Sequence, residues 1–468
     1  MRYKDTLSVL FEALDQEHAL GGVTRGLVVR DLRGRVRLVL DWEVSATKVD
    51  DLGSALSTKL GDWFYRPILH LQRNEELKRF AQKLFERAAV GRPEWDWTYV
   101  KRATGATVEV PNTWTGLQQT LSKQSWLGTH VSPPWPLLSK TPSIVSFYSY
   151  KGGVGRSTLL GLVATRLAAR GEKVVVVDLD LEAPGQHRLF VDNEVEDGVL
   201  DFLAEHLATG RARIDGLVRR LPIPIQMPSQ PGHTPRDIDV LPAGRVGAGT
   251  AYLEMLARLD YVSNDLDGRN PARSPVELAL RDLLKQVRQV HTPDWILLDA
   301  RTGLHDLGGL ALHALGHIDV LIGRANQQDY EGLSVAIELL SRRSEAVKDG
   351  RLVLVQNMLA TDPDLREKRL SEAREHFYAV ARRSLWRDEN DNELPTPDDH
   401  GIHQPIPISF DAQVSQASSL AEIDPAFLSG EGMNQLVSSI DDLRSPQDAD
   451  SDETDVAIEE EEEEERRG

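Results

Sequence analysis

The sequence contains no cysteine in 468 residues, so disulfide bonds, thiolate zinc sites and cysteine-held iron–sulfur clusters are all excluded. It has no apolar run approaching the roughly 20 residues that a membrane-spanning helix needs. No apolar segment follows residues 1–6, as a secretory signal would require. We therefore expect a cytoplasmic protein with no membrane span, long enough for two or three domains.

Basic residues are outnumbered, and the formal net charge is −19. Much of this excess is local, because residues 441–468 hold 14 acidic and three basic side chains. This segment contributes −11, which leaves an unremarkable −8 for the rest of the chain. The run Glu459–Glu465 predicts a disordered acidic tail over 444–468, either simply solvated or serving as a docking arm for a basic partner.

Residues 1–135 are expected to form a small α+β domain of unknown role. Two β-rich runs, 27–32 and 36–40, flank a short turn and predict a hairpin. Helical spacing covers 50–65 and 74–89, and residues 97–100 are typical of a strand. We interpret five tryptophans here as packing residues: Trp42, Trp63, Trp95, Trp97 and Trp114. By elimination, the region is a candidate partner-binding or sensor module.

The stretch 143–158 organises the rest of the chain. Residues 144–150 are β-branched, apolar and aromatic, which predicts a buried strand, and 157–170 have helical spacing. Between them lies a turn with three glycines, Gly152, Gly153 and Gly155. Strand, glycine-rich turn and helix N-terminus together make a phosphate cradle, because backbone N–H groups can approach the anion closely.

This loop departs from the usual G-x-x-x-x-G-K-[ST] pattern at two positions. Tyr150 replaces the first glycine, Arg156 replaces the lysine, and an extra lysine, Lys151, precedes the glycines. The arrangement resembles the deviant Walker A loop of the ParA/MinD/Get3 family (SIMIBI class) of P-loop NTPases, in the variant that carries KGGVGR. That resemblance implies an α/β fold with a doubly wound, mostly parallel sheet over a domain spanning 140–443.

Two further strands end in carboxylates. Residues 172–180 end in Asp178 and Asp180, and residues 294–299 end in Asp299. Carboxyl ends of parallel strands meet at one edge of a sheet, where nucleotides bind. The resemblance implies that Asp180 positions or polarises the attacking water. It also implies the magnesium-site residues, which are Ser157 as ligand, Asp299 acting through water, and Asp178 in the outer sphere.

The resemblance also implies where the base lies. Asn357, at the end of a strand over 351–357, is expected to pair with adenine, and residues 404–411 resemble a segment that closes over the base, with Pro407 and Asp411 at the matched positions. Arg301 replaces a proline just before the second switch segment, and its role stays open. The nucleotide-binding residues predicted in this way are Gly152, Gly153, Val154, Gly155, Arg156, Ser157, Thr158, Asn357 and Pro407.

Other segments carry no chemistry in this interpretation. The proline-rich stretch 192–236 is expected to be an insertion or mobile loop. His305, His313 and His317 lack a third metal ligand of clear identity and are interpreted as structural, the last two on one helix.

The resemblance implies ATP and Mg²⁺ as cofactors, with Lys151, Arg156 and Asp180 as the catalytic residues. Lys151 is implied to reach the partner's nucleotide, so that ATP bridges a homodimer. Arg156 keeps the charge of the missing lysine but is a wide planar fork, and we therefore expect slow hydrolysis.

Three functions remain open. The first is an ATP-dependent switch that regulates a partner in a bacterial signalling or conflict system through residues 1–135. The second is an ATP-dependent sensor or scaffold without hydrolysis. The third is a partitioning or positioning ATPase, which the acidic tail and the lack of an obvious basic stripe do not favour, so nucleic acid is not the expected partner.

Overall fold

The computed structural model describes two compact units, residues 1–129 with 260–275, and residues 130–259 with 276–468. The described residues are 5–19, 25–31, 33–40, 45–70, 98–101, 104–111, 113–118, 123–127, 132–190, 195–225, 234–259, 274–341, 350–386 and 401–444, with single positions 79, 82, 85, 396 and 399. Residues 445–468 of the predicted acidic tail lie outside them, as do Trp42, Trp95 and Trp97. No helix within these ranges is long and apolar enough to cross a membrane.

The first unit is a small α+β domain, as its sequence predicts. Its main sheet has the order β3-β2-β1-β6, with β1 antiparallel to β2 in the predicted hairpin and parallel to β6. Strands β4 and β5 form a separate antiparallel pair. The elements are α1 Thr6–Gln16, β1 Gly26–Arg30, β2 Val36–Leu40, α2 Ala46–Leu60, η2 Gly61–Trp63, β3 Leu69–His70, β4 Thr98–Val100, β5 Thr107–Glu109, β6 Trp114–Gln118 and α4 Gln124–Leu127.

Trp114 contributes to the core of this unit, which confirms its interpretation as a packing residue. It is 3 % exposed and clusters with side chains of α1 and α2, among them Leu10 and Leu56. Its ring lies so close to Gly26 in the neighbouring strand that a Cβ there would meet the ring at 2.7 Å. A glycine at position 26 therefore lets β1 pair with β6 beside a large indole.

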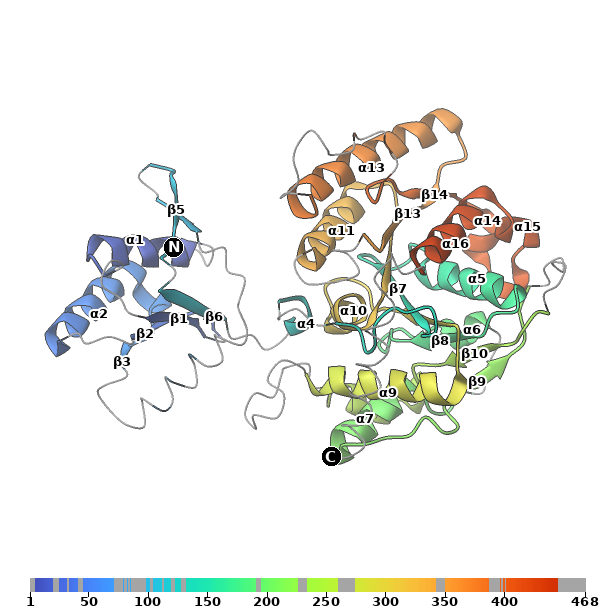
Figure 1. Ribbon diagram of the computed structural model, residues 1–468, viewed down its shortest axis with the longest axis horizontal. Helices are drawn as coiled ribbons and strands as arrows, with labels where there is room; N and C mark the ends of the chain where they lie inside the picture. The colour runs from blue at the N-terminus through green and yellow to red at the C-terminus, as the bar shows by residue number, and fades with distance from the viewer. Residues whose placement is uncertain are drawn as a thin grey trace. The chain divides into compact units, whose positions relative to one another are not determined.

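The second unit is an α/β domain with one eight-stranded sheet (Figure 1). Its strands are β7 Ser143–Ser149, β8 Val174–Asp178, β9 Arg219–Leu221, β10 Ile238–Leu241, β11 Trp295–Asp299, β12 Ile318–Gly323, β13 Leu352–Leu359 and β14 Ile406–Ser409. Its helical segments are α5 Arg156–Ala169, α6 Gln186–Leu189, α7 Val199–Thr209, η3 Val246–Ala248, α8 Thr250–Leu256, α9 Pro275–His291, α10 Asp306–Leu310, η4 Ala311–Leu315, α11 Gln327–Leu340, α13 Pro363–Ser384, α14 Ala412–Gln416, η5 Leu420–Glu422, α15 Pro425–Leu428 and α16 Glu431–Arg444.

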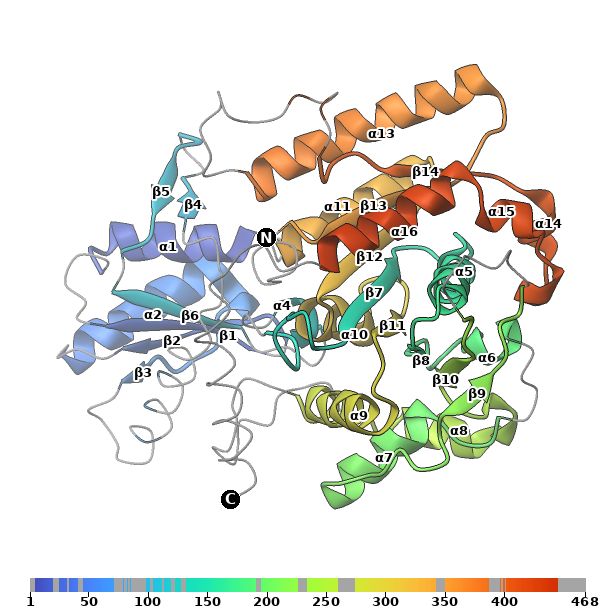
Figure 2. The ribbon, with the colours of Figure 1, turned by 45° about the vertical axis from the view of Figure 1, so that its right-hand side comes forward.

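The strand order is β14-β13-β12-β7-β11-β8-β10-β9, and every neighbouring pair is parallel except the edge pair β9–β10. Side chains of β7 that alternate along the strand, Val145 and Phe147, join one core cluster with α5 and α16. Helices α11 and α13 cover the sheet from the other side (Figure 2). The predicted fold class, a doubly wound and mostly parallel sheet, is confirmed.

The parallel strands explain the position of the site. β7 lies between β11 and β12, and the chain crosses from β7 through α5 to β8, which pairs with β11 on its far side. The segments that follow β7, β8, β11, β12 and β13 therefore gather at one edge of the sheet.

Two predictions about secondary structure were wrong. Residues 192–236 were expected to be an insertion or mobile loop, but their described part contains α7 and the antiparallel edge strand β9. Pro222 and Pro224, which follow β9, are tolerated because an edge strand leaves one row of its backbone groups without a neighbouring strand. His317 does not share a helix with His313. It lies in the turn before β12, where Nδ1 accepts a hydrogen bond from Ile144 N and Nε2 bonds Trp135 O, which confirms its structural role.

Candidate functional site

The glycine-rich loop joins β7 to α5 as the sequence predicts. Gly153 and Gly155 have φ angles of 72° and 84°, in the left-handed region that favours glycine. Helix α5 begins at Arg156, so the backbone N–H groups of its first turn, including those of Ser157 and Thr158, have no partner within the helix. Unpaired donors at a helix N-terminus favour an anion at this point.

Asn357 holds the loop from the end of β13. Its Nδ2 donates to Val154 O at 2.8 Å, and its Oδ1 accepts from Met358 N at 2.8 Å. The approach is close, since a Cβ on Gly155 would lie 2.5 Å from Asn357 Nδ2. Both ends of the amide are thus engaged within the protein, and its predicted contact with adenine stays a prediction.

A cavity of about 230 Å³ opens beside the loop. Asp411 lines it and caps α14 by accepting a hydrogen bond from Val414 N at 2.9 Å. Pro407 lies in β14 and does not line it. The residues that line the cavity are Gly153, Gly155, Thr158, Leu159, Arg324, Asn357, Met358, Ser409, Phe410, Asp411, Val414, Ser415, Ala417 and Phe427. Mixed polar and apolar surface beside a phosphate cradle suits a nucleobase and its ribose.

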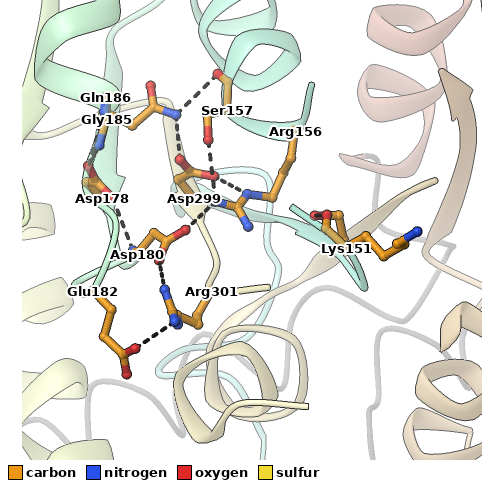
Figure 3. A network of polar contacts seen from close by, with 11 residues as sticks. Lys151, Arg156, Ser157, Asp178, Asp180, Glu182, Gly185, Gln186, Asp299 and Arg301 are labelled. Carbon is orange, nitrogen blue, oxygen red and sulfur yellow. Dashed lines mark hydrogen bonds and ion pairs between the residues drawn. The ribbon is translucent and has the colours of Figure 1, made fainter. Parts of the chain in front are cut away.

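Arg156 points inward from the start of α5 and joins two strand ends (Figure 3). Its Nε lies 2.5 Å from Asp299 Oδ1, and its NH2 lies 2.9 Å from Asp180 Oδ2. The three side chains are between 1 % and 8 % exposed. The opposite charges and hydrogen bonds of these two carboxylates outweigh burial and raise the pKa of Arg156, so the guanidinium stays charged.

Gln186, from α6, is a site residue that sequence reasoning missed. Its Nε2 donates to Asp299 Oδ2 at 2.8 Å and to the carbonyl of Ser157 at 3.2 Å. Both oxygens of Asp299 therefore accept from protein donors. A single buried glutamine after the Ala-Pro-Gly turn carries no motif, so the sequence offered no signal for it.

Arg301, whose role the sequence left open, forms ion pairs with two acidic side chains. Its NH1 lies 2.7 Å from Asp180 Oδ1, and its NH2 lies 2.7 Å from Glu182 Oε2. Asp180 is thus held between two arginines, one from α5 and one from the segment after β11. This contact links the two segments that follow β8 and β11.

Asp178 shapes the segment after β8. Its Oδ1 accepts from Asp180 N at 3.1 Å, and its Oδ2 accepts from the N–H groups of Gly185 and Gln186 at 3.1 Å each. Complete burial, with the charge of Asp299 adding to it, raises the pKa of Asp178 to about 7. Its predicted place around magnesium stays a prediction, whereas its hold on the loop that carries Asp180 and Gln186 is direct.

Lys151 belongs to a different side of the loop. In Figure 3 its side chain points away from the cluster of Arg156, Asp180 and Asp299. This orientation leaves the intramolecular cluster without it. Its predicted reach to a second subunit stays a prediction.

The oxygen atoms around Ser157 suit Mg²⁺, which prefers hard oxygen ligands and keeps waters when it binds phosphates. The Ser157 hydroxyl and the Asp299 carboxylate supply such oxygens, and Gln186 Oε1 is buried without a hydrogen-bond partner among the described atoms. No group of three His, Asp or Glu side chains in the described ranges could hold a metal alone. A metal here would therefore complete its ligands with waters or phosphate oxygens.

Residues 142–221, from the start of β7 to the end of β9, match the family model described as "AAA domain". The iron–sulfur cluster carrier protein of Clostridium perfringens is 46 % identical over 52 residues, which are 11 % of this chain and 18 % of that protein. The chain spans less than a fifth of the length of the curated relatives it matches. With no cysteine, these 468 residues cannot hold such a cluster through thiolates.

Solved structures similar to the chain include pNOB8 ParA bound to nonspecific DNA, at 15 % identity and a TM-score of 0.40, covering 65 % of this chain and 97 % of that one. Another is cobyrinic acid a,c-diamide synthase from Mycobacterium smegmatis with bound ADP and magnesium, at 18 % identity and a TM-score of 0.37, covering 57 % and 88 %. The AAA-domain match includes the loop and α5, which supports the P-loop prediction for these residues. The finer KGGVGR assignment stays a prediction.

Proposed function

We propose that this chain is an ATP-binding switch whose two nucleotide states are read by a partner. One observation carries the proposal, namely that a glycine-rich loop and the N-terminus of α5 lie beside two buried strand-end carboxylates, Asp180 and Asp299. A phosphate cradle next to acids that can hold a metal and a water is the arrangement that phosphoryl transfer requires. The neighbouring cavity gives room for the base.

Each part of the site has a defined task in this proposal. The backbone N–H groups from Gly153 to Ser157 hold the phosphates, and Arg156 contributes positive charge. Asp180 orients the attacking water. Magnesium, held by Ser157 and through water by Asp299, would supply charge neutralisation on the phosphates.

Turnover is expected to be slow, because Arg156 replaces the compact lysine of the usual loop. Asp180 accepts a hydrogen bond on each oxygen, from Arg156 and from Arg301, which fixes the carboxylate and leaves one lone pair on each oxygen for a water. The arginine at position 156 also favours a second candidate function, an ATP-dependent sensor without hydrolysis. Dimerisation through Lys151 is part of the proposal in either case, because its side chain points away from the intramolecular cluster.

The partner and its system are proposals too. We assign the partner contact to the first unit, which has its own core, and place the switch in a bacterial signalling or conflict system in the cytoplasm. This assignment rests on the KGGVGR resemblance of the loop.

Calorimetric titration of the full chain with ATP, ADP and GTP, each with magnesium, tests the nucleotide site. We expect micromolar binding of adenine nucleotides, weaker binding of GTP, and loss of binding in Gly155→Ala. Phosphate release followed on the same samples separates the two candidates, since the switch releases phosphate slowly and the sensor releases none. Absence of binding by any nucleotide would refute both.

A further inference from the structure

The two acids of the site have all four carboxylate oxygens engaged by protein donors. Arg156 and Gln186 each donate a hydrogen bond to one oxygen of Asp299, at 2.5 and 2.8 Å. Arg156 and Arg301 each donate a hydrogen bond to one oxygen of Asp180, at 2.9 and 2.7 Å. Among the described residues, Arg156 alone donates to both acids, so its guanidinium lies between the segments that end β8 and β11.

The guanidinium also lies near the remaining oxygen ligand expected for a metal. Its NH2 is 3.4 Å from Ser157 Oγ. Arg156 therefore contacts both Ser157 and Asp299, the two residues that suit Mg²⁺, and it brings one positive charge to them. The positive charge of the guanidinium, 2.5 Å from Asp299 Oδ1, repels a divalent cation that would bind the same carboxylate.

We propose that Arg156 and a divalent cation exclude one another at Asp299. In this arrangement the chain binds a nucleoside triphosphate without metal, and Mg²⁺ enters only after the guanidinium has withdrawn from the carboxylate. The nucleotide part of this inference rests on the proposed function, whereas the exclusion of metal by Arg156 does not.

A second feature of Arg156 supports metal-free binding. Its NH1 is buried and has no hydrogen-bond partner among the described atoms, although the residue is only 6 % exposed. Arginine presents five N–H donors in a fixed fork, so it can hold two carboxylates and still donate to a phosphate oxygen. Lysine, with one compact charge, cannot span both acids in this way.

Manganese binding to the full chain, followed by electron paramagnetic resonance without nucleotide, tests the exclusion alone. Arg156→Lys should bind one Mn²⁺ at least about tenfold more tightly than the natural chain. The matched control is Arg170→Lys at the other end of α5, where the arginine pairs with Asp441, and it should behave like the natural chain. Equal manganese affinity in the natural chain and in Arg156→Lys would overturn the proposal.

Binding of a fluorescent ATP analogue, compared in EDTA and in magnesium, tests the consequence for nucleotide. The natural chain should change affinity by less than about threefold between the two conditions, and Arg156→Lys should gain about tenfold or more with magnesium. A tenfold gain in the natural chain itself overturns the proposal and leaves the proposed function intact, even if the variant fails to fold. Binding in neither condition refutes the proposed function, and the manganese result then decides the exclusion.

Discussion

Arg156 Nε lies 2.5 Å from Asp299 Oδ1, although 143 residues separate the two in sequence. This contact ties the start of α5 to the end of β11, and it places one buried positive charge among three buried carboxylates, those of Asp178, Asp180 and Asp299. Buried charges are stable only when they are paired. The cluster is therefore both the candidate site and an electrostatic weak point of the fold.

Replacing Arg156 by glutamine should destabilise the second unit strongly. The substitution leaves the carboxylates of Asp180 and Asp299 buried without their common counter-charge, which costs about 3 kcal/mol or more. Arg213→Gln is the control, because Arg213 is 83 % exposed and its pair with Asp215 is worth little. Urea unfolding measures both, and equal effects would contradict the cluster's importance.

Gln186→Glu should place a further carboxylate against Asp299. At neutral pH we expect a loss on the order of 2 kcal/mol in unfolding free energy relative to Gln186→Leu, which removes the same hydrogen bonds without adding charge. Thermal or urea unfolding of the two variants checks this. Equal stability of the two variants would show that position 186 does not face Asp299.

Gly155→Ala should destabilise more than Gly153→Ala. Both glycines have positive φ, so both variants pay the left-handed penalty of about 1 kcal/mol. Only the new Cβ at position 155 meets a neighbour, Asn357 Nδ2 at 2.5 Å, whereas nothing lies within 4 Å of one at 153.

The test is a double-mutant cycle in urea. Asn357→Ala should reduce the difference between the two glycine variants, because it removes the atom with which the Cβ collides. A difference that persists in the Asn357→Ala background would mean that the loop is held by another contact.

The sequence predicted most of the strands that carry this site, and missed how the side chains between them meet. Continuous β-branched runs such as 174–177 occur because a parallel strand is buried on both faces, and the carboxylates that end such strands are easy to find. The partners of Arg156 depend instead on which strands are neighbours, which periodicity does not encode. Gln186 and Arg301 reach the site because β8 and β11, which precede them, are paired neighbours in the sheet.

The segment 192–236 illustrates a different limit. Its five prolines indicated an insertion or mobile loop, yet α7 and β9 fold within it. The described prolines Pro222, Pro224 and Pro235 lie just after the edge strand β9 or just before β10. The average composition of such a stretch conceals a short helix that has an apolar face. In α7 this buried face includes Leu200 and Leu203.

Acid should destabilise the second unit through His317. Burial, with the charge of Arg351 adding to it, lowers the pKa of His317 from 6.5 to about 4, while its hydrogen bond to Trp135 O opposes the shift. Between pH 6.5 and 4, His317 is therefore protonated in the unfolded chain and neutral in the folded chain. Unfolding free energy should fall by about 3 kcal/mol as pH drops from 6.5 to 4.

Urea unfolding at several pH values, with His317→Asn beside the natural chain, measures this contribution. The variant should lose less stability on acidification. His206→Asn is the control and should retain the full dependence, because His206 is not part of this contact. An unchanged acid sensitivity in His317→Asn would assign it to other groups.

Molar mass by light scattering, without nucleotide, with ADP and magnesium, and with ATP and magnesium, tests the central claim most directly. The account predicts a monomer without nucleotide and with ADP, and a dimer with ATP that Lys151→Ala abolishes while ATP binding is retained. A mass that no nucleotide changes, or an ATP-dependent dimer that survives Lys151→Ala, would contradict it.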